Sequence, residues 1–288
     1  CRLKASIYNK SSDLRHTIFK EGQMADNERK VAIVTGSATG VGAAAAIMLA
    51  EKGCNVVINY TRSKDEAEAT AEECRSHGIE AIAFQADVSE DDDCRAMAKA
   101  AVDKWGRIDF LINNAARTKF NPFPQMDGVS KQDFLDIYAV NVVGPYQMIR
   151  AVEPIMRKTG GAVVNDSSIG GVTGIASSIP YAASKAALNL MTKSLAHVLG
   201  PEIRINTVVP GMIQTRWLKG GLGDEQYEAM LAATSETLPL KKVATAEEVA
   251  EVLVWFLFGA SVVTGETLIV DSGMHLGPFP PYASGEPQ

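Results

Sequence analysis

The chain has 288 residues, of which 46% are hydrophobic and 22% are charged, and its formal net charge at pH 7 is -6. This is the composition of an ordinary globular protein with enough chain for a sizeable core. The acidic balance argues against a nucleic-acid partner and gives no sign of a membrane-surface site. The strongest apolar run, 252–263, is too short to span a membrane as a helix.

The two ends of the chain differ in character from the rest. Residues 1–28 are polar and net basic, lack an apolar run, and do not resemble a secretory signal, so we interpret them as a flexible extension. We expect a single domain over 29–276 and an irregular, proline-rich tail over 277–288.

The cysteines Cys1, Cys54, Cys74 and Cys94 have neither zinc-site nor disulfide-framework spacing. Free thiols indicate a reducing compartment, so we expect a cytoplasmic protein. No metal-ligand cluster is visible in the sequence, and no metal is expected.

From Lys30 onward, short apolar runs alternate with helical patterns. The apolar runs predict buried strands, because a parallel sheet covered on both faces has strands without polar alternation. The predicted strands are 31–34, 56–58, 81–84, 108–112, 162–164, 203–209 and 267–270. The predicted helices are 41–51, 64–76, 90–104, 131–156 with an interruption near Gly144-Pro145, 180–199 and 246–258. This alternation predicts an α/β, Rossmann-like doubly wound parallel sheet of about seven strands with helices on both faces.

A glycine-rich stretch, Gly36-Ser37-Ala38-Thr39-Gly40-Val41-Gly42, links the first predicted strand to the first helix. Glycines there allow left-handed backbone and the close approach of a pyrophosphate, and the helix N-terminus offers unpaired N–H groups. The spacing is Gly-x3-Gly-x-Gly and not the general GxGxxG pattern. Its position between strand and helix favours dinucleotide binding over a plain turn.

The end of the second strand indicates which dinucleotide binds. An acidic residue at this position would hold the ribose 2′-OH of NAD, but the sequence reads Asn59-Tyr60-Thr61-Arg62. Arg62 would suit a 2′-phosphate, which favours NADP(H), with NAD(H) as the alternative. A solvent-facing Arg62 with no such role stays open.

Tyr181 and Lys185 are four residues apart within a predicted helix, so both side chains leave the same face. A phenol is a poor acid at neutral pH, and a neighbouring ammonium would lower its pKa. Such a pair is a candidate general acid–base unit, although an amphipathic helix can carry it by chance.

Together these features resemble the short-chain dehydrogenase/reductase family. The matching motifs are Thr35-Gly36-(x3)-Gly40-Val41-Gly42, Asp87 in Ala86-Asp87-Val88, Asn113-Asn114-Ala115-Ala116, Asn141, Ser167-Ser168, Tyr181-(x3)-Lys185, and Pro210-Gly211 followed by Thr215. They occur in the family's order and cover about Lys30 to Gly273. The resemblance implies a seven-stranded sheet, a nicotinamide cofactor, and a homotetramer or homodimer.

The resemblance also implies roles for single residues. Tyr181 would be the general acid, and Lys185 would lower its pKa and contact the nicotinamide ribose. Ser168, 13 residues before Tyr181, would polarise the substrate carbonyl, and Asn141 would hold a water that passes protons to Lys185. The implied cofactor-binding residues are Gly36, Thr39, Gly40, Val41, Gly42, Tyr60, Arg62, Asp87, Val88, Asn114, Ala115, Tyr181, Lys185, Pro210, Gly211, Ile213 and Thr215.

Three positions depart from the commoner family pattern. Thr39 stands where NADP-preferring members often carry Arg or Lys, which weakens the NADP prediction. Ala116 replaces a usual glycine. Asp166 precedes the serines where an apolar residue is usual, and a carboxylate buried there would need a partner.

Two stretches are predicted to choose the substrate. Residues 212–238 carry Trp217, Leu218, Tyr227, Met230 and Leu231 around Gly220, Gly221 and Gly223, a pattern typical of an apolar lid, although packing on the core or on a second subunit is the alternative. Residues 117–128, with Phe120 and Phe123, are predicted to form the opposite wall.

The overall pattern is similar to 3-oxoacyl-[acyl-carrier-protein] reductases and related carbonyl reductases, so the expected substrate is a small carbonyl, alcohol or acyl thioester. The alternatives are an NAD-linked sugar, polyol or hydroxysteroid dehydrogenase and a non-catalytic dinucleotide sensor.

Overall fold

Seven parallel strands form the central sheet of this computed structural model, which describes residues 29–216, 220 and 223–277. Their spatial order is β3-β2-β1-β4-β5-β6-β9, so the predicted doubly wound parallel sheet is confirmed. The strands are β1 (Val31–Val34), β2 (Asn55–Tyr60), β3 (Ala81–Gln85), β4 (Phe110–Asn113), β5 (Gly161–Asp166), β6 (Ile203–Pro210) and β9 (Thr267–Val270).

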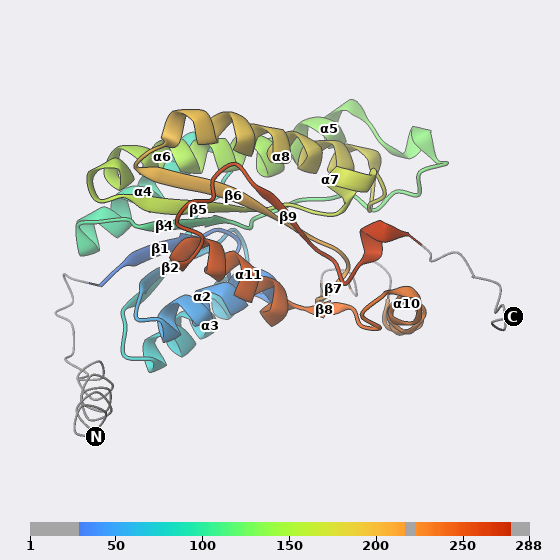
Figure 1. Cartoon of the computed structure of the whole chain (residues 1–288), viewed down its shortest axis with the longest axis horizontal. Helices are drawn as coiled ribbons and strands as arrows, with labels where there is room; N and C mark the ends of the chain where they lie inside the picture. The colour runs from blue at the N-terminus through green and yellow to red at the C-terminus, as the bar shows by residue number, and fades with distance from the viewer. Residues whose placement is uncertain (1–28, 217–219, 221–222, 278–288) are drawn as a thin grey trace, which may run out of the picture.

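Helices cover both faces of this sheet, as Figure 1 shows. One face carries α2 (Gly40–Glu51), α3 (Lys64–Ser76) and α11 (Ala246–Phe258). The other carries α4 (Asp91–Trp105), α5 (Lys131–Tyr138), α6 (Gly144–Thr159) and α8 (Ile179–Leu199). Smaller elements are α7 (Gly170–Thr173), α10 (Asp224–Thr237), the 3-10 turns η2 (Met126–Gly128) and η4 (Met274–Leu276), and a two-stranded sheet of β7 (Ile213–Gln214) and β8 (Ala244–Thr245).

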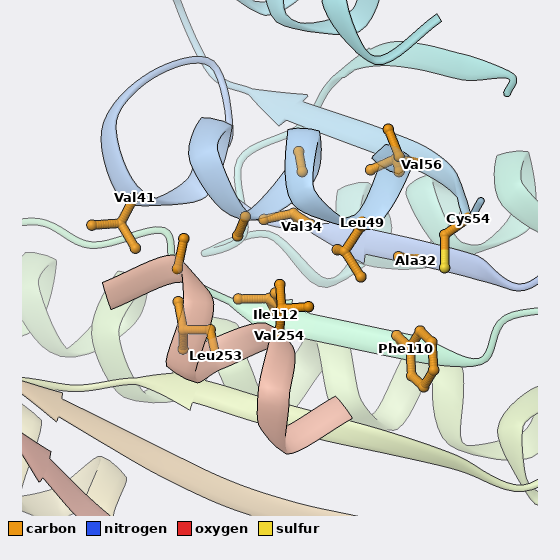
Figure 2. Packing of buried hydrophobic residues seen from close by; sticks show 14 of the residues in the cluster. Ala32, Val34, Val41, Leu49, Cys54, Val56, Phe110, Ile112, Leu253 and Val254 are labelled. Atoms are coloured by element: carbon orange, nitrogen blue, oxygen red, sulfur yellow. The ribbon is translucent and has the colours of Figure 1, made fainter. Parts of the chain in front are cut away.

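Two hydrophobic clusters hold the helices to the sheet. Successive strand side chains point to opposite faces, so Ala32 and Val34 join one cluster while Val31 and Ile33 join the other. The first cluster packs α2 and α11 against β1, with Leu253 among its fully buried side chains (Figure 2). Burial on both faces explains why these strands appear as unbroken apolar runs in the sequence.

Two predicted elements differ from the structure. The strand predicted over 108–112 is β4, which begins at Phe110 and reaches Asn113. Asp109 precedes the strand, and its carboxylate accepts a 2.9 Å hydrogen bond from the Val31 N–H at the start of β1.

The helix predicted over 131–156 is interrupted at Ala139–Val143, a π-helical turn, before the expected Gly144-Pro145. Pro145 lies in the first turn of α6, where a missing N–H costs no helical hydrogen bond.

Several expectations concern residues without a described structure. The extension over 1–28, with Cys1, and the tail over 277–288 apart from Gly277 lie outside the described residues. Within the described part, the other three cysteines are buried and unpaired, and no helix is long and apolar enough to cross a membrane.

Candidate active site

A cleft of about 1300 Å³ opens at the carboxyl ends of the strands. β1 lies between β2 and β4 in the sheet, so the chain order reverses there, and ligands of doubly wound sheets bind at such a point. The lining residues used below are Gly36, Thr39, Gly40, Val41, Thr61, Arg62, Asp87, Val88, Asn114, Ala115, Arg117, Phe120, Asp166, Ser167, Ser168, Ile175, Tyr181, Lys185, Pro210, Gly211, Ile213, Thr215, Arg216, Met230 and Met274.

The glycine loop is fastened to its neighbours on both sides. The Gly36 N–H donates a 2.9 Å hydrogen bond to the Asn59 side chain from β2. The Asn114 amide donates to the carbonyls of Thr35 and Gly36, each at 2.9 Å. A Cβ on Gly42 would lie 2.6 Å from Nδ2 of Asn114, so only glycine allows this close approach. Asn59 was not predicted as part of the site; its buried position at a strand end was the only signal.

The loop leaves room and donors for a phosphate. Gly36 and Gly40 both adopt φ of 62°, a conformation that favours glycine. Thr39 is the residue before α2, and its side chain makes no capping hydrogen bond. The first backbone N–H groups of the helix are therefore not bonded to the Thr39 side chain and can donate to a ligand in the cleft. This arrangement fits the pyrophosphate of a dinucleotide.

The part of the cleft beyond β2 and β3 is lined by Thr61, Arg62, Asp87 and Val88. Arg62 is exposed and makes no hydrogen bond or ion pair with any described residue. Tyr60, predicted to contact the cofactor, does not line the cleft but belongs to a hydrophobic cluster, because adjacent strand residues face opposite sides.

Tyr181, Ser168 and Lys185 all line the cleft; the helical spacing predicts the pairing of Tyr181 with Lys185, and the family resemblance implies Ser168 beside them. The Ser168 hydroxyl lies close enough to the Tyr181 phenol to lower its pKa. Lys185 Nζ lies 5.7 Å from the centroid of the Tyr181 ring and donates a 2.7 Å hydrogen bond to the Asp166 carbonyl. The Ser167 hydroxyl instead donates to the Lys185 carbonyl at 3.2 Å, so its proton is directed to the backbone of α8.

The electrostatics of this cluster differ from the sequence-based prediction. Burial raises the pKa of Tyr181 above its usual range, and the charge of Asp166 raises it further. Burial lowers the pKa of Lys185 to about 8, and burial raises the pKa of Asp166 to about 7. The expected lowering of the Tyr181 pKa by Lys185 is therefore wrong for this structure, because burial of the phenol is the largest effect.

Asn141 lies behind the cleft rather than in its lining, fully buried in the π-helical turn. Its side chain accepts from the Arg117 N–H at 2.8 Å and donates to the Arg117 carbonyl at 2.9 Å. It also donates to the Ser184 hydroxyl at 3.0 Å. Asn141 thus ties the wall segment to α8, next to the Tyr181 and Lys185 turn.

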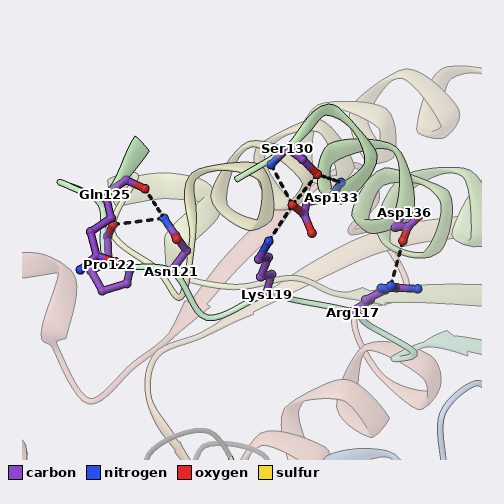
Figure 3. Close-up of polar contacts among 8 residues, drawn as sticks. All are labelled: Arg117, Lys119, Asn121, Pro122, Gln125, Ser130, Asp133 and Asp136. Carbon is purple, nitrogen blue, oxygen red and sulfur yellow. Dashed lines mark hydrogen bonds and ion pairs between the residues drawn. The ribbon is translucent and has the colours of Figure 1, made fainter. Parts of the chain in front are cut away.

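Ion pairs and hydrogen bonds from the Asn121 side-chain amide to nearby carbonyls hold the wall predicted over 117–128 (Figure 3). Arg117 pairs with Asp136 at 2.9 Å, and Lys119 pairs with Asp133 at 2.8 Å. Phe120 lines the cleft, whereas Phe123 does not.

Of the residues predicted for the lid, Met230 on α10 lines the cleft and Tyr227 is buried. Trp217, Leu218 and Gly221 lie outside the described residues. Ile175 and Met274 add apolar lining that the sequence did not indicate.

Most predicted site residues therefore meet in one cleft; Gly42, Tyr60 and Asn141 do not line it. Gly42 and Asn141 lie against residues that do, whereas Tyr60 faces the core.

Known proteins share this sequence pattern along most of the chain. Residues 36–275 match the family model described as Enoyl-(Acyl carrier protein) reductase. A Streptomyces violaceoruber protein named as a ketoacyl reductase of the granaticin polyketide synthase is 38% identical over 250 residues, covering 86% of this chain and 97% of the relative. The 3-oxoacyl-[acyl-carrier-protein] reductase of Staphylococcus epidermidis is 36% identical over 250 residues, covering 86% of this chain and 99% of the relative.

Solved structures agree with this relationship. A Burkholderia xenovorans protein described as a short-chain dehydrogenase/reductase has a TM-score of 0.81 and 37% identity, covering 87% of this chain and 99% of the other. A xylitol dehydrogenase with bound NAD⁺ has a TM-score of 0.76 and 26% identity, covering 84% and 97%. From its cleft, its fold and these relatives, we conclude that the chain belongs to the short-chain dehydrogenase/reductase family of NAD(P)-dependent oxidoreductases.

Proposed function

We propose that this protein is an NADPH-dependent carbonyl reductase whose substrate is a 3-oxoacyl thioester. The observation that carries the proposal is that Tyr181 and Ser168 line the same cleft beside Lys185, so that two hydroxyl groups can both donate to one carbonyl oxygen. The substrate class is supported by relatives named as ketoacyl and 3-oxoacyl reductases.

In this proposal the bound cofactor supplies a hydride to the carbonyl carbon. Ser168 donates a hydrogen bond to the carbonyl oxygen, and Tyr181 gives that oxygen its proton, so that a secondary alcohol forms. Lys185 is held by its hydrogen bond to the Asp166 carbonyl. It would contact the cofactor ribose, and its positive charge would offset the negative charge left on the Tyr181 phenol after proton transfer. Asn141 orients the segment that carries Arg117 and, in line with the family resemblance, holds a water for proton transfer to Lys185.

The raised pKa of Tyr181 is compatible with this direction of reaction. A general acid must carry its proton at the start of the step, and burial keeps the Tyr181 phenol protonated at neutral pH. The residue is therefore ready to act on a carbonyl rather than on an alcohol.

The dinucleotide would lie along the glycine loop and across the carboxyl ends of β1 and β4. Gly36, Thr39, Gly40 and Val41 would hold the pyrophosphate, with Gly42 allowing the loop its close approach. Asp87, Val88, Asn114 and Ala115 would contact the adenosine and the body of the cofactor, and Pro210, Gly211, Ile213 and Thr215 the nicotinamide.

The preference for NADP(H) rests on Arg62. Its guanidinium is free of described partners and lines the cleft just after β2, where no acidic residue competes for a ribose hydroxyl. A guanidinium can bind a 2′-phosphate with two hydrogen bonds.

An apolar part of the substrate is supported by Phe120, Ile175, Met230 and Met274 in the cleft lining. The alternative, an NAD-linked sugar, polyol or hydroxysteroid dehydrogenase, has the xylitol dehydrogenase likeness in its favour, at the lower identity of 26%.

The expectations of a homotetramer, a cytoplasmic location and a single catalytic domain over 29–276 belong to the same proposal. Exposed apolar side chains on α5, α6 and α8, among them Leu135, Tyr146, Leu190 and Val198, support association with a second copy.

The test is the initial rate of NADPH oxidation with acetoacetyl-coenzyme A, beside NADH and beside crotonyl-coenzyme A. We expect turnover of the 3-oxo compound with NADPH. Reduction of crotonyl-coenzyme A alone would assign enoyl chemistry instead, and turnover only with NADH would overturn the cofactor preference. Dinucleotide binding without turnover of thioesters, sugars, polyols or steroids would favour the sensor.

A further inference from the structure

Next to the candidate catalytic residues lies a carboxyl group that makes no hydrogen bond with the described part of the chain. Asp166 ends β5 and lines the cleft, yet only 9% of the residue is exposed. Its Oδ1 is buried and has no hydrogen-bond partner among the described residues. A buried carboxyl oxygen without a hydrogen-bond partner destabilises the folded protein, so we infer that the group contributes to function.

The neighbouring ammonium does not neutralise this group by hydrogen bonding. Lys185 Nζ donates to the backbone carbonyl of Asp166, not to its carboxylate. The carboxyl charge nevertheless acts on both Lys185 and Tyr181, which places it within electrostatic reach of the atoms that handle the proton. Because the pKa of Asp166 is about 7, a negative charge is available above that pH in the part of the cleft where hydride transfer is proposed to occur.

We propose that the Asp166 carboxylate stabilises the positive charge of the oxidised nicotinamide, so that the cleft binds the oxidised dinucleotide in preference to the reduced form. The inference rests on the proposed function. When a hydride moves to the carbonyl carbon and Tyr181 gives its proton to the oxygen, the alcohol is formed and the nicotinamide ring is left as a cation. A fixed carboxylate favours that product state, and so it makes the bound cofactor a stronger hydride donor.

The test compares the dissociation constants of NADP⁺ and NADPH for the wild-type protein and two variants, by calorimetry at about pH 8, where most of the carboxyl is ionised. Asp166→Asn keeps the shape and removes the charge, and Asp166→Leu supplies the apolar character usual in the family. Asp103→Asn, which removes an exposed carboxylate on α4, is the matched control. NAD⁺ and NADH are titrated in parallel.

We expect the ratio of the NADP⁺ to the NADPH dissociation constant to rise about tenfold in both Asp166 variants. This is the change in an equilibrium constant that corresponds to a shift of one pKa unit. The ratio should stay constant in the control. An unchanged ratio in either folded Asp166 variant overturns the inference while leaving the proposed function intact. Failure of the wild-type protein to bind any dinucleotide overturns both.

Discussion

Lys185 and Asp166 are joined by a 2.7 Å hydrogen bond from the ammonium to the backbone carbonyl, which fixes α8 to the end of β5. The same pair is coupled through the charge of the Asp166 side chain, which opposes the burial that lowers the pKa of Lys185 and adds to the burial that raises the pKa of Tyr181. One residue therefore positions the lysine with its backbone and, after burial, is the second influence on the proton affinity of both candidate catalytic groups.

Asp166→Asn should move the alkaline limb of the reductase pH profile to lower pH. Ketone reduction needs a protonated Tyr181, and loss of the Asp166 charge removes one cause of its raised pKa. The measurement is kcat/KM with acetoacetyl-coenzyme A across the alkaline range. A limb that stays in place would mean that Asp166 does not influence the tyrosine.

The stability of the wild-type protein relative to Asp166→Asn should fall as the pH rises from about 4 to about 7. The pKa of Asp166 is raised from 3.8 to about 7 on folding, so its contribution to stability is fully present below 3.8 and is lost as the pH rises through 7. Lys185, with its pKa lowered to about 8, acts at higher pH: its contribution is present above 10.5 and is lost as the pH falls through 8. Urea unfolding of both proteins at several pH values checks this, and a constant difference between them contradicts it.

Tyr181→Phe should lower kcat by about 10²–10⁴-fold because the general acid is removed while the ring still fills its site. NADPH binding should change little, since the aromatic ring and its contact with Lys185 are retained. Stopped-flow turnover and calorimetric binding separate the two effects. Turnover near the wild-type rate would exclude Tyr181 as the acid.

Arg62→Ala should reduce kcat/KM for NADPH about tenfold or more and leave NADH almost unchanged, because one charge-assisted contact to a phosphate is lost. Lys99→Ala, an exposed cation on α4, serves as the control for a general charge effect. Equal losses with both cofactors would remove Arg62 from phosphate recognition.

Asn141→Ala should lower the free energy of unfolding by about 2–3 kcal/mol, because it removes three hydrogen bonds that the buried Asn141 side chain makes with Arg117 and Ser184. If Asn141 also supports proton transfer to Lys185, kcat should fall even at a temperature where the variant is fully folded. Gln132→Ala, on the exposed face of α5, should change stability by less than about 0.5 kcal/mol. Chemical denaturation and kcat measured at one temperature test both statements.

The sequence by itself determined the order and type of the main elements. Buried parallel strands are apolar along their whole length, so runs such as Val31–Val34 are visible without any tertiary knowledge. The glycine loop and the Tyr181–Lys185 pair are also local patterns, since their geometry follows from a strand-to-helix turn and from one helical turn.

Only the tertiary structure decided how distant residues complete the site. Asn59 fastens the glycine loop from β2, and Asn114 fastens it from the position just after β4. Asn141 reaches the wall from a π-helical turn, and no local pattern encodes these contacts. The direction of the Tyr181 pKa also depends on burial and on Asp166, which lies 15 positions earlier in the sequence. Desolvation is a property of the assembled fold, so proton affinities in this cleft could not be derived from residue types and spacing.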